Sequence, residues 1–129
     1  MQNTLQQKKQ LLLVEDDATN AFVIRKFLES NFDIKYVTNA NSAIEALKTQ
    51  TIDAVLMDIN LGDEDIDGIQ TLKMIRKMPQ NNHLPVIAVT AYAMMGDKER
   101  FLKEGFNDYV AKPVEKMLLI STISKQINN

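Results

Sequence analysis

Short apolar runs alternate along the chain with longer segments in which apolar residues recur every three or four positions. The runs expected to be strands are Gln10–Val14, Asp33–Val37, Ala54–Met57, Pro85–Thr90 and Asp108–Ala111. The segments between them have the period of amphipathic helices. Most of the runs are apolar at nearly every position, which is typical of strands covered on both faces. The pattern therefore predicts an α/β fold with a parallel sheet between two layers of helices.

The helical segments carry recognisable start and stop signals. Thr19 or Asn20 is expected to cap the first helix, and Asn39 or Asn41 the second. The other helices are expected to start at Asp67-Gly68 and end at Pro79, to cover Lys98–Glu104, and to cover Val114–Gln126. Gly105 is expected to end the fourth helix in a left-handed conformation.

The length of 129 residues suits one domain with its own hydrophobic core. For a doubly wound sheet of this size, the flavodoxin-like order is the usual solution. We therefore expect a five-stranded parallel sheet in the order 2-1-3-4-5 with five helices. Residues 1–9 are expected to form a polar lead-in and residues 10–127 the domain.

The composition excludes several classes of function. With 15 basic and 17 acidic side chains the net charge is −2, so no broad surface for direct binding of nucleic acid is expected. No apolar run approaches the ~20 residues that span a bilayer, and the amino terminus lacks the apolar core of a signal peptide. The chain has no cysteine, which excludes disulfides, thiol catalysis and zinc–thiolate sites. These features favour a protein of the reducing cytoplasm.

Polar side chains follow the expected strands at their carboxyl ends, which share one edge of a parallel sheet. These residues are Glu15, Asp16 and Asp17 after the first strand, Asp58 after the third, Thr90 at the end of the fourth and Lys112 after the fifth. The first and third strands are neighbours in the expected order, so Asp16, Asp17 and Asp58 should lie together. Two like charges about 4 Å apart repel by about 4 kcal/mol at an effective dielectric constant of about 20, which calls for a divalent cation. Magnesium prefers a few carboxylates, waters and phosphate oxygens, and so suits this cluster.

A carboxylate beside a magnesium ion can act as a nucleophile toward phosphorus. We expect Asp58 to form an aspartyl phosphate. The Lys112 ammonium would pair with one phosphoryl oxygen, and the Thr90 hydroxyl would donate to another. Positioning and charge neutralisation do most of the work in phosphoryl transfer, so these groups suffice. The Lys112–Pro113 bond can be cis or trans, and a cis bond would aim the lysine into the site.

Four motifs occur in sequence along the chain: LVEDD at 13–17, VLMDIN at 55–60, VIAVTA at 86–91 and DYVAKP at 108–113. Together they resemble the receiver domain of two-component response regulators, in the order and at the separations of that family. The resemblance covers the chain from about Gln10 to Gln126. Any one of the motifs alone would be weak, but the set is specific.

The resemblance implies a phosphoacceptor role and a metal site. Asp58 would accept a phosphoryl group from a histidine of a sensor kinase or of a histidine phosphotransfer protein. Asp17, Asp58 and the backbone carbonyl of Asn60 would bind Mg²⁺ (or Mn²⁺) directly, and Asp16 would bind it through water. The protein would be a regulator that promotes its own phosphotransfer and a slow autodephosphorylation.

The resemblance also implies how the signal leaves the site. Thr90 and Lys112 would contact the phosphoryl oxygens, and Tyr109 would be the aromatic switch residue that follows the movement of Thr90. Asn60 and Tyr92 match positions that tune hydrolysis of the acyl phosphate. The output surface would be formed by the fourth helix, the fifth strand and the fifth helix. Its partner would be a downstream protein or the kinase domains of the same chain.

One segment departs from the family pattern. Gly62 stands where a proline is common, and Asp63-Glu64-Asp65 makes the following loop longer than usual. An ordinary solvated loop is favoured over a loop that changes cation affinity or partner choice. Asp63–Gly68 also matches the start of an EF-hand calcium loop, but the twelfth position is Met74 instead of the bidentate Glu that calcium needs.

The alternative from a different class is a haloacid-dehalogenase-like phosphatase, which also uses an aspartyl nucleophile, magnesium and a lysine. Such an enzyme carries its nucleophile on the first strand and a second Asp two residues later, whereas residue 60 is Asn. His83 lies in a polar loop and is interpreted as a solvated residue, not as a phosphodonor. Two origins remain open, a stand-alone receiver and a receiver from a hybrid sensor kinase, and the segment from Ala88 to Pro113 resembles hybrid-kinase receivers somewhat more.

Overall fold

The computed structural model describes residues 8–59, 68–91 and 96–128 of the chain. Within them a sheet is formed by β1 (Lys9–Val14), β2 (Phe32–Val37), β3 (Ala54–Asp58), β4 (Val86–Thr90) and β5 (Asp108–Ala111). The strand order is β2-β1-β3-β4-β5 and every neighbouring pair is parallel, which confirms the flavodoxin-like prediction.

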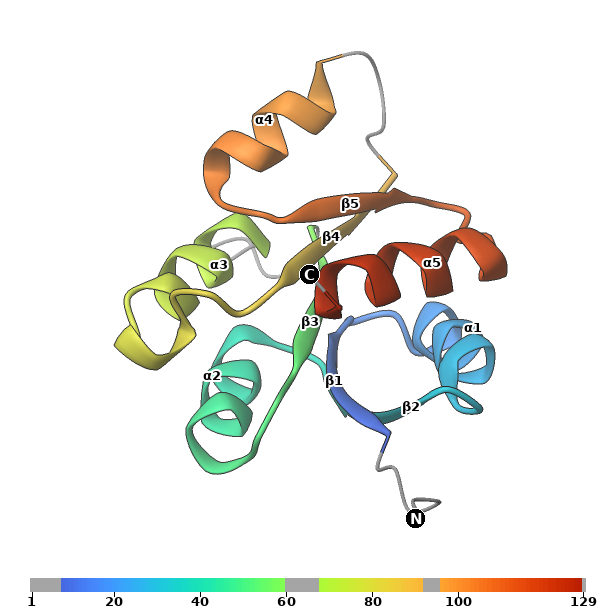
Figure 1. Cartoon of the computed structure of the whole chain (residues 1–129), viewed down its shortest axis with the longest axis horizontal. Coiled ribbons are helices and arrows are strands. Elements are labelled where there is room, and N and C mark those ends of the chain that lie inside the picture. Colours follow the sequence, from blue (N-terminus) through green and yellow to red (C-terminus); the bar gives the residue numbers. More distant parts are fainter. Residues whose placement is uncertain (1–7, 60–67, 92–95, 129) are drawn as a thin grey trace.

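Helices cover both faces of this sheet. They are α1 (Ala18–Leu28), α2 (Ala40–Thr49), α3 (Gly68–Arg76), α4 (Asp97–Glu104) and α5 (Lys116–Ile127), with a short 3₁₀ helix, η1 (Pro79–Asn81), before β4. Figure 1 shows α1 and α5 together on one face and α2 and α3 on the other, with α4 beyond the β5 edge. Among the described residues no helix is both long and apolar enough to cross a membrane.

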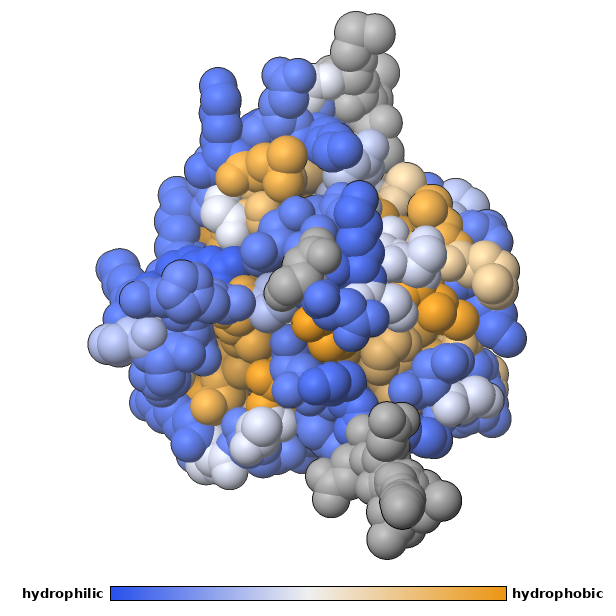
Figure 2. All heavy atoms as spheres, in the orientation of Figure 1, coloured by the Kyte–Doolittle hydropathy of each residue, from blue (hydrophilic) through white to orange (hydrophobic). Residues whose placement is uncertain are grey.

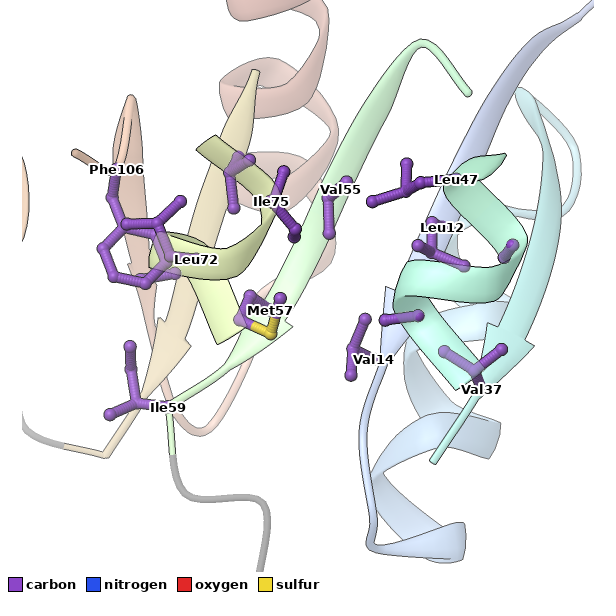
Figure 3. Packing of buried hydrophobic residues seen from close by; sticks show 14 of the residues in the cluster. Leu12, Val14, Val37, Leu47, Val55, Met57, Ile59, Leu72, Ile75 and Phe106 are labelled. Carbon is purple, nitrogen blue, oxygen red and sulfur yellow. The ribbon is translucent and has the colours of Figure 1, made fainter. Parts of the chain in front are cut away.

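The continuous apolar strands supply a core to each face, because successive side chains of a strand point to opposite sides. In β1, Leu11 and Leu13 pack toward α1 and α5, whereas Leu12 and Val14 pack toward α2 and α3. Figure 3 shows the second of these cores, in which β1 and β3 side chains meet those of the covering helices. The prediction that both faces are covered is confirmed.

Several helix boundaries differ from the prediction. The cap of α1 is Asp17, since its Oδ1 accepts hydrogen bonds from the backbone N–H of Thr19 at 2.8 Å and of Asn20 at 3.0 Å. The prediction of Thr19 or Asn20 as the cap was therefore wrong: both residues are inside the helix and their N–H groups are the ones being capped. For α2, the first of the two candidates is the cap, because Asn39 Oδ1 accepts from Ser42 N at 2.9 Å.

The ends of the later helices also shift. Helix α3 stops at Arg76, before Pro79, which instead begins η1. Helix α5 starts at Lys116 instead of Val114, because the Glu115 carboxylate accepts from the N–H groups of the second and third residues of the helix. Gly105 ends α4 with φ of 114°, as predicted.

Gly68 brings the start of α3 against the end of β3. A Cβ at this position would collide with the carbonyl oxygen of Asp58 and would lie 2.8 Å from Ile59 Cα. The Gly68 N–H donates to the Ile59 carbonyl at 2.9 Å, which holds the two segments in this close approach. The glycine therefore fixes the backbone immediately after Asp58.

Gly68→Ala is expected to lower the free energy of unfolding by about 1–3 kcal/mol, because the new methyl group must displace backbone atoms. In an unobstructed helix the same replacement stabilises by up to about 1 kcal/mol, so the sign of the effect identifies the collision. Urea unfolding followed by circular dichroism measures it. Lys73→Ala on the exposed side of α3 is the control and should change the free energy by less than about 0.5 kcal/mol. Equal or greater stability of Gly68→Ala would contradict the prediction.

Candidate functional site

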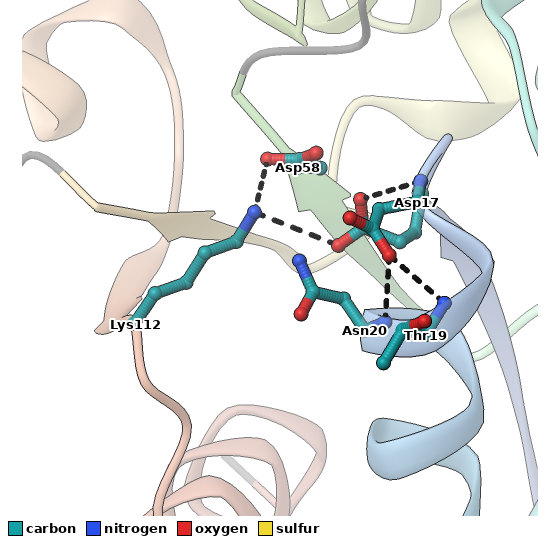
Figure 4. Close-up of polar contacts among 6 residues, drawn as sticks. Asp17, Thr19, Asn20, Asp58 and Lys112 are labelled. Carbon is teal, nitrogen blue, oxygen red and sulfur yellow. Dashed lines mark hydrogen bonds and ion pairs between the residues drawn. The ribbon is translucent and has the colours of Figure 1, made fainter.

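The carboxyl ends of β1, β3 and β5 bring an ammonium group against two buried carboxylates. Asp58 ends β3 and is 3% exposed, and Glu15 follows β1 and is 1% exposed. Lys112 Nζ, just after β5, donates a hydrogen bond to Asp58 Oδ1 at 3.0 Å and lies 3.6 Å from Glu15 Oε1. Figure 4 shows the lysine reaching across the edge of the sheet to the end of β3.

A third carboxylate completes a cluster at this edge. Oxygens of Glu15, Asp16 and Asp58 all lie within 4.8 Å of one another. Glu15 Oε1 is buried and has no hydrogen-bond partner among the described residues. Three converging carboxylates form a set of hard oxygen donors, and such donors suit Mg²⁺, Ca²⁺ or Mn²⁺. The residues therefore fit a divalent cation.

The composition of this cluster differs by one residue from the predicted set of Asp16, Asp17 and Asp58. Asp17 Oδ1 is engaged by the amino terminus of α1, as Figure 4 shows, and Asp17 is not one of the three clustered carboxylates. Glu15 takes that place, since its backbone N–H donates to Val37 O at 3.1 Å and continues the β1 ladder into the site. The capping role of Asp17 could have been predicted from the sequence, because an Asp directly before a helix is a preferred N-cap.

Burial and charge shift the pKa of two groups in the site. Burial, followed by the hydrogen bond and the charge of Asp58, raises the pKa of Glu15 from 4.5 to about 8. Burial acts to lower the pKa of Lys112, but the hydrogen bond and charge of Asp58, together with Glu15, outweigh it and raise this pKa above its ordinary value. Lys112 therefore stays charged, while Glu15 holds a proton near neutral pH and reduces the repulsion among the carboxylates.

Thr90 and Tyr109 lie on the two strands beyond β3. Thr90 is buried at the end of β4, and its carbonyl accepts a hydrogen bond from Lys112 N at 2.8 Å. Tyr109 on β5 is half-buried, and its ring centroid lies 6.3 Å from that of Phe101 on α4. The Lys112–Pro113 peptide bond is cis. The structure thus brings Asp16, Asp58 and Lys112 to one edge, with Thr90 at the end of the neighbouring strand.

Some predicted site residues lie outside the described part of the chain. These are Asn60 and Tyr92, together with the acidic loop Gly62–Asp65. His83 is exposed on the loop before β4, as expected for a solvated residue.

A shallow groove adjoins the site on the side of α1. It has a volume of about 210 Å³ and is lined by Asn20, Val23, Ile24, Lys112, Pro113 and Val114. Lys112 belongs to both the groove and the carboxylate cluster, so the two features are continuous.

Comparison with known proteins identifies the class. Residues 11–124 match the family model for the response regulator receiver domain, and the chain therefore belongs to this family. The Escherichia coli K12 signal transduction histidine-protein kinase BarA is 37% identical over 107 residues, which cover 82% of this chain and 11% of BarA. The Brucella anthropi polar-differentiation response regulator DivK is 32% identical over 122 residues, which cover 94% of this chain and 98% of DivK. The chain thus spans about a tenth of the kinase and nearly all of the stand-alone regulator.

A solved structure of a receiver domain has a similar fold. The receiver domain of the sensor histidine kinase PA1611 from Pseudomonas aeruginosa PAO1 superposes with a TM-score of 0.84 at 34% identity. The match covers 95% of this chain and 99% of that domain, which carries a magnesium ion coordinated in its active-site cleft.

The pKa of Glu15 predicts how stability depends on pH in metal-free buffer. The unfolded chain releases this proton near pH 4.5, whereas the folded protein keeps it to about pH 8. Between these values the unfolded state binds fewer protons, so the contribution of Glu15 to the free energy of unfolding falls as pH rises. Glu15→Gln removes this contribution. The free energy of unfolding of the variant minus that of the parent should therefore increase from about pH 5 to about pH 8 and then level off. Urea unfolding in the presence of a chelator measures the difference, and a difference independent of pH would contradict the assignment.

Proposed function

We propose that this receiver domain is a phosphoacceptor switch of a two-component phosphorelay, in which Asp58 takes a phosphoryl group from a histidine. The observation that carries the proposal is the buried Asp58 carboxylate, held by Lys112 Nζ at 3.0 Å beside two further carboxylates. An Asp58 oxygen attacks phosphorus as the P–N bond to the donor imidazole breaks, and the bonding electron pair stays on the imidazole nitrogen. The donor is a sensor histidine kinase or a histidine phosphotransfer protein.

Each residue at the edge has a role in this transfer. The Lys112 ammonium leaves its contact with Asp58 in part and pairs with a phosphoryl oxygen, since a flexible point charge suits a tetrahedral anion. The Thr90 hydroxyl donates to a second oxygen. Asn60 and Tyr92, which lie outside the described residues, tune the slow hydrolysis that returns the domain to its resting state. The protein is a regulator that is modified once per event and not an enzyme that turns over a metabolite.

Glu15, Asp16 and Asp58, together with the backbone carbonyl of Asn60, would hold the divalent cation. A bound Mg²⁺ neutralises charge on the transferring phosphoryl group and on the carboxylates around it. Mn²⁺ takes the same kinds of oxygen ligand and would substitute for it. Support comes from the converging carboxylates and from Glu15 Oε1, which is buried and makes no hydrogen bond among the described residues, although it lies 3.6 Å from Lys112 Nζ. In this proposal Asp17 serves α1 as its cap, while its predicted role as a direct ligand is tested below.

The phosphodonor would dock over α1 and the start of α5, where the groove runs into the site. Val23 lines this groove, and both helices carry exposed apolar side chains: Phe22 and Val23 on α1, and Met117 and Leu118 on α5. Figure 2 shows hydrophobic side chains gathered over this side of the molecule, among hydrophilic ones. A donor histidine seated there would reach Asp58 beside Lys112.

Phosphorylation would bias a two-state equilibrium through Thr90 and Tyr109 toward an altered α4–β5–α5 surface. Residues 10–127 would act as the functional unit, with 1–9 as a polar lead-in. The output partner would be a downstream protein or kinase domains of a longer chain. We place the reaction in the cytoplasm, because histidine kinases draw on ATP. The haloacid-dehalogenase alternative finds no support in the family match.

Asp58→Asn should abolish labelling by acetyl phosphate in the presence of Mg²⁺, because the amide is a poor nucleophile toward phosphorus. Intact mass spectrometry followed by peptide mapping should find one base-labile phosphate per chain in the parent and none in the variant. Glu45→Gln on the exposed face of α2 is the control and should be labelled like the parent. Stable labelling of Asp58→Asn at another residue would contradict the assignment of Asp58.

The metal ligands can be separated by two matched variants. Asp16→Asn should weaken Mg²⁺ binding by roughly tenfold or more, because it removes a charged carboxylate from the metal site. Loss of a residue that only supports a ligand already weakens metal binding by about 10–100-fold. Asp17→Asn should leave the affinity nearly unchanged, because Asn keeps the α1 cap and the clustered carboxylates remain. Isothermal titration calorimetry with Mg²⁺ gives both values. A large loss for Asp17→Asn with little loss for Asp16→Asn would restore Asp17 as the direct ligand.

A further inference from the structure

Arg76, the last residue of α3, is a half-buried cation whose hydrogen-bond acceptors are all neutral. Its Nη1 donates to Asn81 O at 3.0 Å and to Leu84 O at 2.6 Å. Its Nη2 donates to Gly105 O at 2.9 Å and to Asn107 Oδ1 at 2.8 Å. None of the described carboxylates pairs with it, and burial lowers its pKa.

These acceptors belong to two segments that are far apart in sequence. Asn81 and Leu84 flank the approach to β4, whereas Gly105 and Asn107 form the turn between α4 and β5. Asn107 Oδ1 also accepts from Val86 N at 2.8 Å, so the same amide joins this turn to the first residue of β4. A planar guanidinium has five N–H donors spread over three nitrogens, whereas the ammonium of a lysine has three donors on one nitrogen and cannot make these four hydrogen bonds. Arg76 therefore fastens the carboxyl end of α4 to α3 and to β4.

The contacts among the described residues differ between the two ends of α4. At the carboxyl end Phe106 N donates to Phe101 O at 3.1 Å around Gly105, and Lys73 Nζ lies 3.4 Å from Glu104 Oε2. At the amino end the cap position is Gly96, which has φ of 92° and no side chain to donate or accept. Phe101 is the one buried residue among those of α4, so the first turn contributes no side chain to the core.

We propose that Arg76 anchors a hinge at Gly105, so that α4 responds to phosphorylation of Asp58 by swinging its amino end while its carboxyl end stays fixed. This inference rests on the proposed function and adds that Arg76 restrains the carboxyl end of α4, the helix of the proposed output surface. Phe101 carries the movement, because its ring meets both Phe106 at 6.0 Å on the anchored side and Tyr109 at 6.3 Å on the switch side. Arg76 is a positioning residue, since it touches neither Asp58 nor its charged partners.

Spin labels on introduced cysteines can test the hinge, because the chain has no cysteine of its own. One label is placed at Lys48→Cys on α2, and the second at either Lys98→Cys or Lys103→Cys, near the two ends of α4. All three lysines are exposed. Beryllium fluoride with Mg²⁺ serves as the phosphoryl mimic, and pulsed electron paramagnetic resonance gives the distance distributions. We expect the mimic to shift the distance to position 98 and to leave the distance to position 103 unchanged.

Arg76→Gln should abolish this asymmetry, so that the mimic shifts both distances. Arg76→Lys keeps the positive charge but cannot make the four hydrogen bonds, so the mimic should again shift both distances. This variant serves as the test if Arg76→Gln is too unstable to measure. Lys73→Gln removes only the exposed ion pair between α3 and α4 and should leave the parent pattern intact. Leu28→Ala, in the core of the opposite layer, controls for general loss of stability and should also keep the pattern.

The outcomes separate the hinge from the proposed function. Equal shifts of both distances in the parent, no shift in a parent loaded at Asp58, or an unchanged pattern in both Arg76 variants would each overturn the hinge. A second portion of each labelled protein, without beryllium fluoride, is treated with acetyl phosphate, and mass spectrometry measures the phosphorylation of Asp58. A failure of phosphorylation is therefore seen directly. The hinge is still tested in that case, because Arg76→Gln should broaden the distance distribution to position 103 without any mimic. An unbroadened distribution would then refute it.

Discussion

The rest of the structure depends on the contact between one ammonium and the carboxylates at the edge of the sheet. Lys112 Nζ lies 3.0 Å from Asp58 and 3.6 Å from Glu15, both of which are almost fully buried. One ammonium faces two buried carboxylates, and burial together with the neighbouring Asp58 raises the pKa of Glu15. The cluster is therefore left with an excess of negative charge when all its members ionise. That excess suits a divalent cation, which in the proposed function would neutralise charge on the phosphoryl group.

The fold supports this charge cluster by making the edge rigid. Parallel order puts the ends of β1, β3 and β5 on one side of the sheet, and two apolar cores clamp the strands from both faces. Gly68 presses α3 onto the backbone of Asp58 and Ile59, so the carboxylate follows a segment with little freedom. Helix α1 is tied to the same edge by Asp17, whose carboxylate is used for capping. One acidic residue thus caps the helix, while Glu15 and Asp16 lie in the carboxylate cluster with Asp58.

The sequence predicted the sheet order, both covering layers and the positions of Asp58, Thr90 and Lys112, because each depends on strong local patterns. Continuous apolar runs mark strands buried on both faces, and the residue that ends each run is fixed at the shared edge. It did not decide which acidic residues of the run at 15–17 converge. That choice depends on where α1 starts. The cap is Asp17, two residues before the earlier of the two predicted caps, so its carboxylate is engaged by the helix while Glu15 and Asp16 remain in the cluster. The role of Arg76 was not predicted, since three of its four acceptors are backbone carbonyls, which leave no pattern of side chains in the sequence.

In the proposed switch, the site and α4 would communicate through the edge of the sheet opposite β2. Thr90 pairs with Ala111 across β4 and β5, and Ala88 pairs with Tyr109 two residues earlier in both strands. The Tyr109 ring meets Phe101, which is the buried residue of α4. A displacement of Thr90 by a phosphoryl group would therefore reach α4 through a single aromatic contact. Because Arg76 holds the far end of that helix with four hydrogen bonds, such a contact can tilt the helix more easily than it can translate it, and a small movement at the site becomes a directed one on the surface.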